Sequence, residues 1–524
     1  MDHALSEPQS APRVSLWPWP FAIAAIYFIA HLATSTRYGY FRDALYYLAC
    51  SHHLDWGYVD QPPLIAALAW VARHTLGTSL PALIFWPALA GAGRIMLVAA
   101  FARELGARRF GIALAAVLAA APGVWWVIDH QFAMNALEPL FWSGCAFVIL
   151  RMIQTQNVRL WLAFGVIAGT GLENKYGIAI FAFALLAGLL ISRERKLLFT
   201  PWLLAGGCVA LLLLLPNLIW NISHHWPFLE VLRNIRATGK DVILPPGTYL
   251  AQQVLMVNPL SFPFWFGGLL FYFFSRGAKA CRALGFAFMI TIACFMALHG
   301  KDYYSAPAYT LLMAAGGAAV ERLLETPRLG ARRTLRLAFA FSCFAWLLIA
   351  IGIQLPLVLP ILPLDGFVRY QARIGIHSTK TEKSFEGAVL PQYYADELPW
   401  PEMVAAVARV YHSLTPEEQA KTAIFGDNYG EAAAVDFFGP QYGLPKAISG
   451  HQTYFLWGPR KYTGEIVILI GRSEDDVRDQ FASVEVAATL HNPYALWYEN
   501  QPILLCRGLK SNLQEIWPRV KYWR

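Results

Sequence analysis

The chain has 524 residues, of which 57% are hydrophobic and only 15% charged, and its mean hydropathy is +0.41. A soluble core of ordinary proportions cannot bury that much apolar surface, so the composition excludes a single soluble domain and indicates a polytopic membrane protein. The formal charge of +8 does not indicate a nucleic-acid partner, because the basic residues lie between apolar runs, where cytoplasmic membrane loops carry them.

The chain begins with a polar segment. Met1 to Pro12 lacks the basic start and the small-residue cleavage site of a secretory signal peptide. Residues 1–16 are therefore expected to form a cytoplasmic tail, and the apolar residues from Trp17 to Ala33 to stay as the first membrane span. The 7 cysteines include no CxxC pair, and we interpret them as packing residues.

The segment from Tyr38 to Leu64 is dense in charged, histidine and aromatic residues and lies between two very apolar segments. Arg42, Asp43, Asp55 and Asp60 lie just where the first span leaves the bilayer. Carboxylates at that depth are costly unless they are paired or hydrated, so a functional site is the working hypothesis.

Two interpretations of Asp43 are open. A carboxylate at a membrane surface, ringed by Tyr46, Tyr47 and histidines, can deprotonate or orient a hydroxyl nucleophile. Alternatively, Asp43 is only the N-cap of a short surface helix over residues 44–51.

A rigid turn follows in the same loop. Pro62 and Pro63 fix the entry angle of the next helix, so Asp60 and Gln61 would be presented rigidly. The apolar segment from Pro63 to Leu76 is short and ends at basic residues, which predicts an interfacial helix rather than a span.

Further apolar runs predict roughly eleven transmembrane helices in total, each near the usual span length. The runs lie at about 17–35, 81–102, 109–127, 137–151, 158–173, 177–192, 202–220, 251–274, 283–298, 304–321 and 335–360. The loops between alternate runs are short and basic, as at Arg193, Arg195 and Lys196, which is typical of the cytoplasmic side. The acidic and aromatic loops then converge on the outer face, and an odd number of spans places the C-terminal region there as well.

Three charged residues mark the outer ends of later spans. Glu138 precedes Pro139 where the apolar run continues, so it lies at or just inside the membrane boundary unless it snorkels to the surface. Lys175, and Lys301 with Tyr303 and Tyr304, suit a lipid phosphate, because an ammonium can bind it as a point charge and tyrosine hydroxyls can complete the shell. The alternative for both lysines is simple interfacial anchoring. Arg233, Arg236 and Lys240 of the long outer loop could serve the same anion.

The composition becomes charged and turn-rich after Leu364, which predicts a soluble α/β domain over residues 365–524 after a membrane domain over residues 17–364. Residues 421–426 and 466–470 are expected to be strands, each followed by a helix, at 431–438 and 474–481. Residues 414–418 predict a helix start, with Pro416 in the first turn. The loops at 427–432 and 449–459 are rich in polar and aromatic residues, which suits sugar or headgroup contact, but spacing alone favours a structural loop.

Five motifs occur in an order that resembles the protein mannosyltransferase and aminoarabinose transferase superfamily, the family-39-like glycosyltransferases of the GT-C fold. They are YFRDALYY at 40–47, DQPPL at 60–64, LEP at 137–139, KYG at 175–177 and KDYY at 301–304. The resemblance covers about residues 17–360. It implies a bacterial inner-membrane enzyme that transfers a sugar from a polyprenyl-phosphate donor to a lipid, glycan or protein hydroxyl on the extracytoplasmic face, for example in lipopolysaccharide.

The resemblance also implies residue roles. Asp43 matches the family's catalytic acid, Glu138 a second membrane-edge carboxylate, and Lys175 and Lys301 positions near the donor phosphate. The other candidate substrate-binding residues are Arg42, Tyr46, Asp60, Gln61, Tyr303 and Tyr304. The sequence departs from the family at Ala44, where relatives often carry a second acid, and at Gln61, where they often carry lysine.

A phosphate leaving group departs without protonation, so such an enzyme needs a base for the acceptor and positive charge for the phosphate. We expect a direct, inverting displacement with Asp43 as the base. A divalent cation could join carboxylates to phosphate, but no ligand spacing requires one. The alternative function is a transporter or flippase of a polyprenyl-linked sugar, although the sequence shows no internal repeat. The transferase hypothesis requires Asp43, Glu138, Lys175 and Lys301 to line one cavity.

Overall fold

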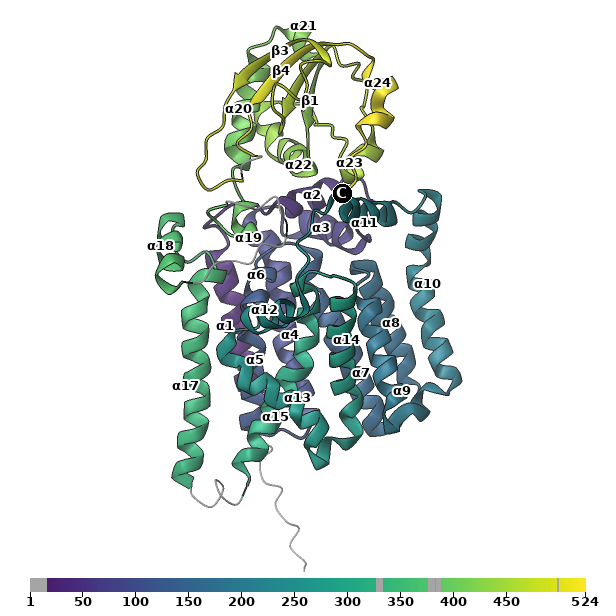
Figure 1. The fold of residues 1–524 in the computed structure, drawn as a ribbon, viewed down its shortest axis with the longest axis vertical. Helices are drawn as coiled ribbons and strands as arrows, with labels where there is room; N and C mark the ends of the chain where they lie inside the picture. The colour runs from purple at the N-terminus through teal and green to yellow at the C-terminus, as the bar shows by residue number, and fades with distance from the viewer. Residues whose placement is uncertain (1–16, 327–332, 376–381, 383–387, 497–498) are drawn as a thin grey trace, which may run out of the picture.

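A bundle of apolar helices forms the lower part of the molecule, and a small α/β domain stands on its upper end (Figure 1). The computed structural model describes residues 17–326, 333–375, 382, 388–496 and 499–524. The bundle contains α1 (Pro18–Thr34), α4 (Leu80–Glu104), α5 (Arg109–Ala120), α7 (Glu138–Thr155), α8 (Leu160–Asn174), α9 (Ile178–Ile191), α10 (Pro201–Ser223), α13 (Phe262–Phe274), α14 (Arg282–Ala297), α15 (Tyr309–Leu324) and α17 (Arg333–Val358).

The helices have the length and composition of a membrane protein. Within the described residues, five helical stretches are long and apolar enough to cross a membrane, or six if one bent pair is a single span. The shorter apolar helices α1, α5 and α9 belong to the same bundle. A polytopic helical membrane protein is therefore confirmed, and the number of eleven spans stays a prediction.

The run at 251–274 is not one continuous helix, contrary to the sequence prediction. Helix α12 (Pro246–Met256) meets the stretch formed by η3 (Pro259–Ser261) and α13 at an angle of 88°. Asn258 has a left-handed φ of 72° and its side chain accepts a hydrogen bond from the Leu260 amide, while Pro259 has no amide hydrogen to continue the helix. These local preferences turn the chain at the wall of the cavity described below.

Three short helices lie between the bundle and the α/β domain in Figure 1: α2 (Arg42–Cys50), α3 (Leu64–Thr75) and α11 (Pro227–Thr238). Helix α3 matches the predicted short helix after the double proline. Asp43 is not the N-cap of α2, because that position is Phe41 and has no side-chain cap. The capping interpretation of Asp43 is therefore wrong.

The α/β domain contains a four-stranded sheet of order β1-β2-β4-β3. Strands β1 (Thr422–Gly426) and β2 (Ile466–Ile470) are parallel and fully buried, and both confirm predicted strands. Strand β4 (Ile503–Leu509) pairs antiparallel with β2 and with β3 (Phe481–Ala488). Helix α20 (Trp400–His412) and the predicted helix α22 (Tyr429–Phe438) pack against the sheet.

Two predicted helices of this domain have different outcomes. Pro416 begins α21 (Pro416–Gln419) behind a capping box made by Thr415 and Glu418, as predicted. The helix predicted over 474–481 is wrong, because the chain forms turns there and β3 starts at Phe481. Asp476 accepts hydrogen bonds from both the amide and the hydroxyl of Ser473, and such local bonds compete with a regular helix.

A shared apolar core joins the two parts of the molecule. Leu45 of α2, Ala69 of α3, Trp400 of α20 and Ala433 of α22 are all fully buried in one cluster. The domain therefore packs directly on the segment that carries α2 and α3. The domain boundary at residues 364/365 stays a prediction.

Candidate active site

A large cavity of about 990 Å³ lies where the bundle meets the α/β domain. Its wall includes eight of the ten candidate site residues, and Arg236 and Lys240 as well. The eight are Arg42, Asp43, Asp60, Glu138, Lys175, Lys301, Tyr303 and Tyr304. Its wall also has an apolar part, with residues such as Val124, Ile353 and Leu357 from α6 (Gly123–Ile128) and α17. Asp43, Glu138, Lys175 and Lys301 thus line one cavity, whose wall is partly polar and partly apolar.

Asp43 lies in the first turn of α2, with its side chain 29% exposed. Its Oδ1 accepts a hydrogen bond from the Tyr429 hydroxyl at 2.7 Å, and Arg42 Nε lies 3.8 Å from the same oxygen. Arg42 is held in turn by Asp396, whose Oδ2 is 3.4 Å from Nη2. The carboxylate is therefore oriented from two sides and still reaches the cavity.

Asp60 is a second cavity carboxylate, in the segment between α2 and α3. Its Oδ1 accepts a hydrogen bond from the Tyr46 hydroxyl at 2.9 Å. Burial raises the pKa of Asp60 to about 7, and the Tyr46 bond opposes that rise. The Tyr46 hydroxyl also lies 2.6 Å from the Thr453 hydroxyl of the α/β domain. Tyr46 thus holds the Asp60 carboxylate through this hydrogen bond and does not line the cavity itself.

Gln61 is a candidate site residue that does not line the cavity. Its side chain is buried, and its Nε2 is 3.8 Å from Cys50 Sγ. The chain reverses at this point, because the Tyr58 amide donates to the Gln61 carbonyl. The neighbours Asp60 and Pro62 face the cavity, and Gln61 points into the protein.

Glu138 and Lys175 form a buried ion pair. Lys175 Nζ lies 3.0 Å from Glu138 Oε2 and donates to Asn135 Oδ1 at 2.6 Å. The Tyr304 ring lies 4.4 Å from the same ammonium. Glu138 is only 5% exposed, so it is not a snorkelling surface residue. Gly177 makes room for it, because a Cβ there would lie 2.9 Å from Glu138 Oε1.

Lys301 is enclosed by acidic partners that sequence reasoning missed. Its Nζ lies 2.8 Å from Glu382 Oε1 and 3.4 Å from Asp241 Oδ1, and Lys240 Nζ lies 3.7 Å from Glu382 Oε2. Burial alone would raise the pKa of Glu382, but the two lysines outweigh it and lower that pKa to about 2. Glu382 is therefore ionised, and no sequence signal distinguishes it in its polar segment.

Two loops of the α/β domain also reach the cavity. Tyr429 and Gln452 line its wall, and each belongs to a loop that the sequence marked for sugar or headgroup contact. Arg524 lines the cavity as well, and its position was not predictable from spacing. Among the residues that the structure describes, no group of three or more His, Cys, Asp or Glu side chains is placed to hold a metal ion.

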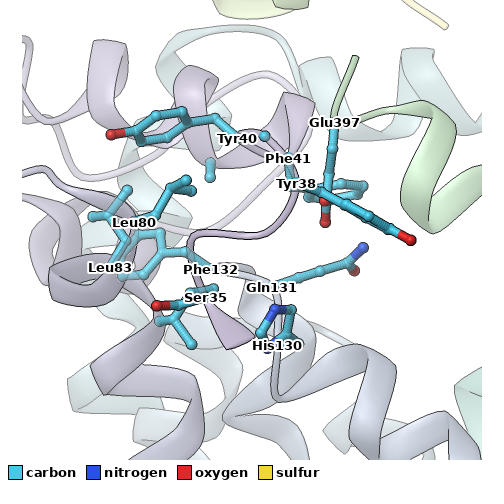
Figure 2. Close-up of a pocket in the computed structure, with 13 residues that line it drawn as sticks. Ser35, Tyr38, Tyr40, Phe41, Leu80, Leu83, His130, Gln131, Phe132 and Glu397 are labelled. Atoms are coloured by element: carbon cyan, nitrogen blue, oxygen red, sulfur yellow. The ribbon is translucent and has the colours of Figure 1, made fainter. Parts of the chain in front are cut away.

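A second, much smaller pocket lies beside the start of α2 (Figure 2). Its volume is about 20 Å³, which is room for about one water molecule and not for a sugar. In Figure 2, Tyr38 and Glu397 stand on one side of it and Leu80 and Leu83 on the other. Burial and then the Asp396 carboxylate raise the pKa of Glu397 well above its usual range. We assign this pocket to packing.

The chain resembles known proteins in sequence and in fold. Residues 60–220 match the family model described as dolichyl-phosphate-mannose-protein mannosyltransferase. The lipopolysaccharide core galacturonosyltransferase RgtB of Rhizobium johnstonii is 27% identical over 253 residues, which are 46% of this chain and 49% of that protein. The lipid A galacturonosyltransferase RgtD of the same organism is 28% identical over 191 residues, 35% of this chain and 39% of that protein. The chain thus spans about half the length, or less, of the curated relatives that it matches.

The fold comparison covers almost the whole molecule. The crystal structure of ArnT from Cupriavidus metallidurans bound to undecaprenyl phosphate has a TM-score of 0.59 to this chain, at 15% identity, over 94% of this chain and 98% of that one. This likeness establishes the fold, including the α/β domain on top of the bundle. The part of the chain that matches the family model includes the cavity residues Asp60, Glu138 and Lys175, and the chain as a whole has an ArnT-like fold.

Proposed function

We propose that the protein is a membrane glycosyltransferase that moves a sugar from a polyprenyl-phosphate donor to a hydroxyl of a lipid A or lipopolysaccharide-core acceptor. The observation that carries this proposal is the convergence of Asp43, Glu138, Lys175 and Lys301 on one cavity with a polar and an apolar wall. A donor with a charged phosphate and a long hydrocarbon chain fits such a cavity. The acceptor class rests on the relatives RgtB and RgtD, which act on the lipopolysaccharide core and on lipid A.

The reaction is a single displacement at the anomeric carbon. The acceptor oxygen forms the new bond to carbon, its proton passes to Asp43, and the bonding electrons of the breaking bond leave with the polyprenyl phosphate. The configuration at the anomeric carbon inverts. Asp43 suits the role of base because one carboxylate oxygen is fixed by Tyr429 and the side chain remains partly exposed to the cavity.

Positive charge for the leaving phosphate comes from Lys175 and Lys301. Both ammoniums line the cavity and are held in place by carboxylates and tyrosine rings. A preorganised cation stabilises charge that develops in the transition state without reorganising during the reaction. Glu138 keeps Lys175 in position and is available to bind sugar hydroxyls.

The sugar we propose is a hexuronic acid, as in the two galacturonosyltransferase relatives. Its carboxylate needs a cation beyond those that hold the phosphate. Lys240 supplies one, since it lines the cavity beside Lys301. The proposed topology has about eleven spans, with the cavity and residues 365–524 on the periplasmic side of the bacterial inner membrane, in agreement with the short basic loops on the opposite side.

Glycolipid profiling by mass spectrometry tests the proposal. Envelopes would be compared from cells with the wild type, with Asp43→Asn and without the protein, at matched membrane levels. We expect a hexuronic acid added to lipid A or core only with the wild type, and at least about a hundredfold less product with Asp43→Asn, because a general base contributes about 10²–10⁴-fold. If cells with Asp43→Asn contain as much modified glycolipid as cells with the wild type, while cells without the protein lack it, the result favours a transporter over a transferase.

Asp55→Asn is a matched control for that experiment. Asp55 belongs to the same loop, is exposed, and bonds to the neighbouring Trp56 amide outside the cavity. Its loss should leave product formation unchanged. A loss of product with Asp55→Asn as well would point to damage to the loop and not to a missing base.

A further inference from the structure

The C-terminal α/β domain places one of its side chains directly on the candidate base. Tyr429, the first residue of α22, donates a hydrogen bond from its hydroxyl to Asp43 Oδ1 across 2.7 Å. The two residues are 386 positions apart in the sequence, and both line the cavity. We infer that Tyr429 is a positioning residue that fixes Oδ1 of Asp43 and leaves Oδ2 for the acceptor hydroxyl. This inference rests on the proposed function.

The backbone of Tyr429 is fixed by the start of its helix. Asn428 and Glu431 form a capping box in which each side chain bonds to the other's backbone amide. Gly430 lies directly against α2, because a Cβ there would be 2.4 Å from Arg42 Cγ. Only a residue without a side chain lets α22 approach α2 this closely, so the sequence Asn428-Tyr429-Gly430 is suited to deliver the tyrosine to Asp43.

The ring of Tyr429 is held on three sides. Its centroid lies 4.6 Å from that of Tyr46 and 5.0 Å from that of His451, which stacks on it, and the Arg42 guanidinium is 5.4 Å away. The Tyr429 amide also donates to His451 Nδ1 at 3.2 Å. A ring packed in this way has few rotamers available. The hydroxyl therefore stays directed at Asp43 without further ordering when substrate binds.

A hydrogen bond to a carboxylate favours the ionised form, which is the form that can act as a base. The groups that face Asp43 are Arg42 and Tyr47 from α2, Asp60 from the following loop, Asp396 after α19 (Gln392–Ala395), and Tyr429 from α22. Of these groups, Tyr429 and Arg42 lie against Asp43 Oδ1. Loss of the Tyr429 hydroxyl should therefore lower kcat and leave KM for the donor nearly unchanged, since the proposed phosphate site at Lys175 and Lys301 is not altered.

The test compares Tyr429→Phe with Tyr454→Phe in the full-length protein. Tyr454 is a buried tyrosine of the same domain whose hydroxyl donates to Asp436 Oδ2 at 3.0 Å, and neither Tyr454 nor Asp436 lines the cavity. Purified protein in detergent would receive a short-chain polyprenyl phosphate galacturonic acid as donor and lipid A as acceptor. For Tyr429→Phe we expect kcat to fall at least about tenfold, since a hydrogen bond to a charged group is lost, with KM for the donor nearly unchanged. Tyr454→Phe should keep the wild-type kcat and KM.

The outcomes separate the inference from the function on which it rests. If the wild type is active and Asp43→Asn inactive, but Tyr429→Phe behaves like Tyr454→Phe, the inference is overturned and the proposed function stands. A lower kcat for Tyr429→Phe that comes with a comparable rise in KM for the donor overturns it too, because that result indicates only a structural role. If the wild type itself transfers no sugar from this donor, the proposed function and the inference fall together.

Discussion

Glu138 and Lys175 form an ion pair between the start of α7 and the residue that follows α8, with 3.0 Å between oxygen and nitrogen. Their side chains are only 6% and 16% exposed. A charge at this depth is costly by itself, and each partner lowers the cost of the other. The pair therefore fixes the geometry of the cavity wall, and each charge depends on the other to be tolerated there.

Removal of one partner should leave an uncompensated buried charge. We expect Lys175→Met or Glu138→Gln alone to lower the free energy of unfolding by about 3 kcal/mol, and the double variant to lower it by less than either. Thermal unfolding of the purified protein in detergent would measure this. Lys421→Met, which breaks the exposed pair with Glu465, should not change the melting temperature measurably. A double variant that is as unstable as the sum of the singles would rule out a coupled pair.

The membrane explains how much of this site was predictable from the sequence. Residues at the ends of spans on one side of a membrane are confined to one surface, so Asp43, Glu138, Lys175 and Lys301 could be placed near one another without knowing any tertiary contact. Strands β1 and β2 were equally predictable from the sequence, because buried parallel strands are short, continuous apolar runs.

Other features depend on contacts between distant segments and left no local pattern. The bond from Tyr429 to Asp43 requires the α/β domain to dock on α2, and the burial of Gln61 depends on how one turn packs against Cys50. Glu382 gains its importance only from the lysines that surround it. Hydrophobic periodicity cannot report such pairings, since it describes one element at a time.

Lys301 should be needed for the donor more than for folding. Lys301→Met removes a cation beside the proposed phosphate site, and we expect KM for the donor to rise about tenfold or kcat to fall by a similar factor. Kinetics with the polyprenyl phosphate donor would measure this. Lys279→Met is the control, because Lys279 lies in η4 (Arg276–Cys281) before α14 and does not line the cavity. Unchanged kinetics for Lys301→Met would remove Lys301 from the phosphate site.

Asp60 should make the stability of the protein depend on pH. Its folded-state pKa is raised by burial to about 7, so the folded chain keeps a proton that the unfolded chain releases near pH 4, the usual pKa of about 3.9. The stability from this proton is complete below about pH 4 and is lost as the pH rises through about 7. The melting temperature of the wild type should therefore fall relative to that of Asp60→Asn between pH 5 and pH 8. A constant difference between the two proteins over this range would contradict the raised pKa.

A second buried ion pair lies inside the bundle and depends on a glycine. Arg94 Nη2 is 3.0 Å from Asp129 Oδ2, and the Tyr27 hydroxyl donates to the same oxygen at 2.8 Å. Gly91 leaves the space for this carboxylate, because a Cβ there would lie 2.2 Å from Asp129 Oδ2. An added methyl group must displace Asp129 from both partners, or push α4 away from it.

Gly91→Ala should therefore destabilise the protein by about 1–3 kcal/mol, the usual cost of overpacking a buried site, although alanine is the better helix former. The control is Gly207→Ala in α10, where a Cβ would meet no atom within 4 Å and the higher helix propensity should raise stability slightly. Thermal unfolding in detergent would compare the two. If Gly91→Ala is as stable as Gly207→Ala, the Asp129 carboxylate can move without cost. The Arg94–Asp129 pair then would not hold α4 to the loop after α6, which carries part of the cavity wall.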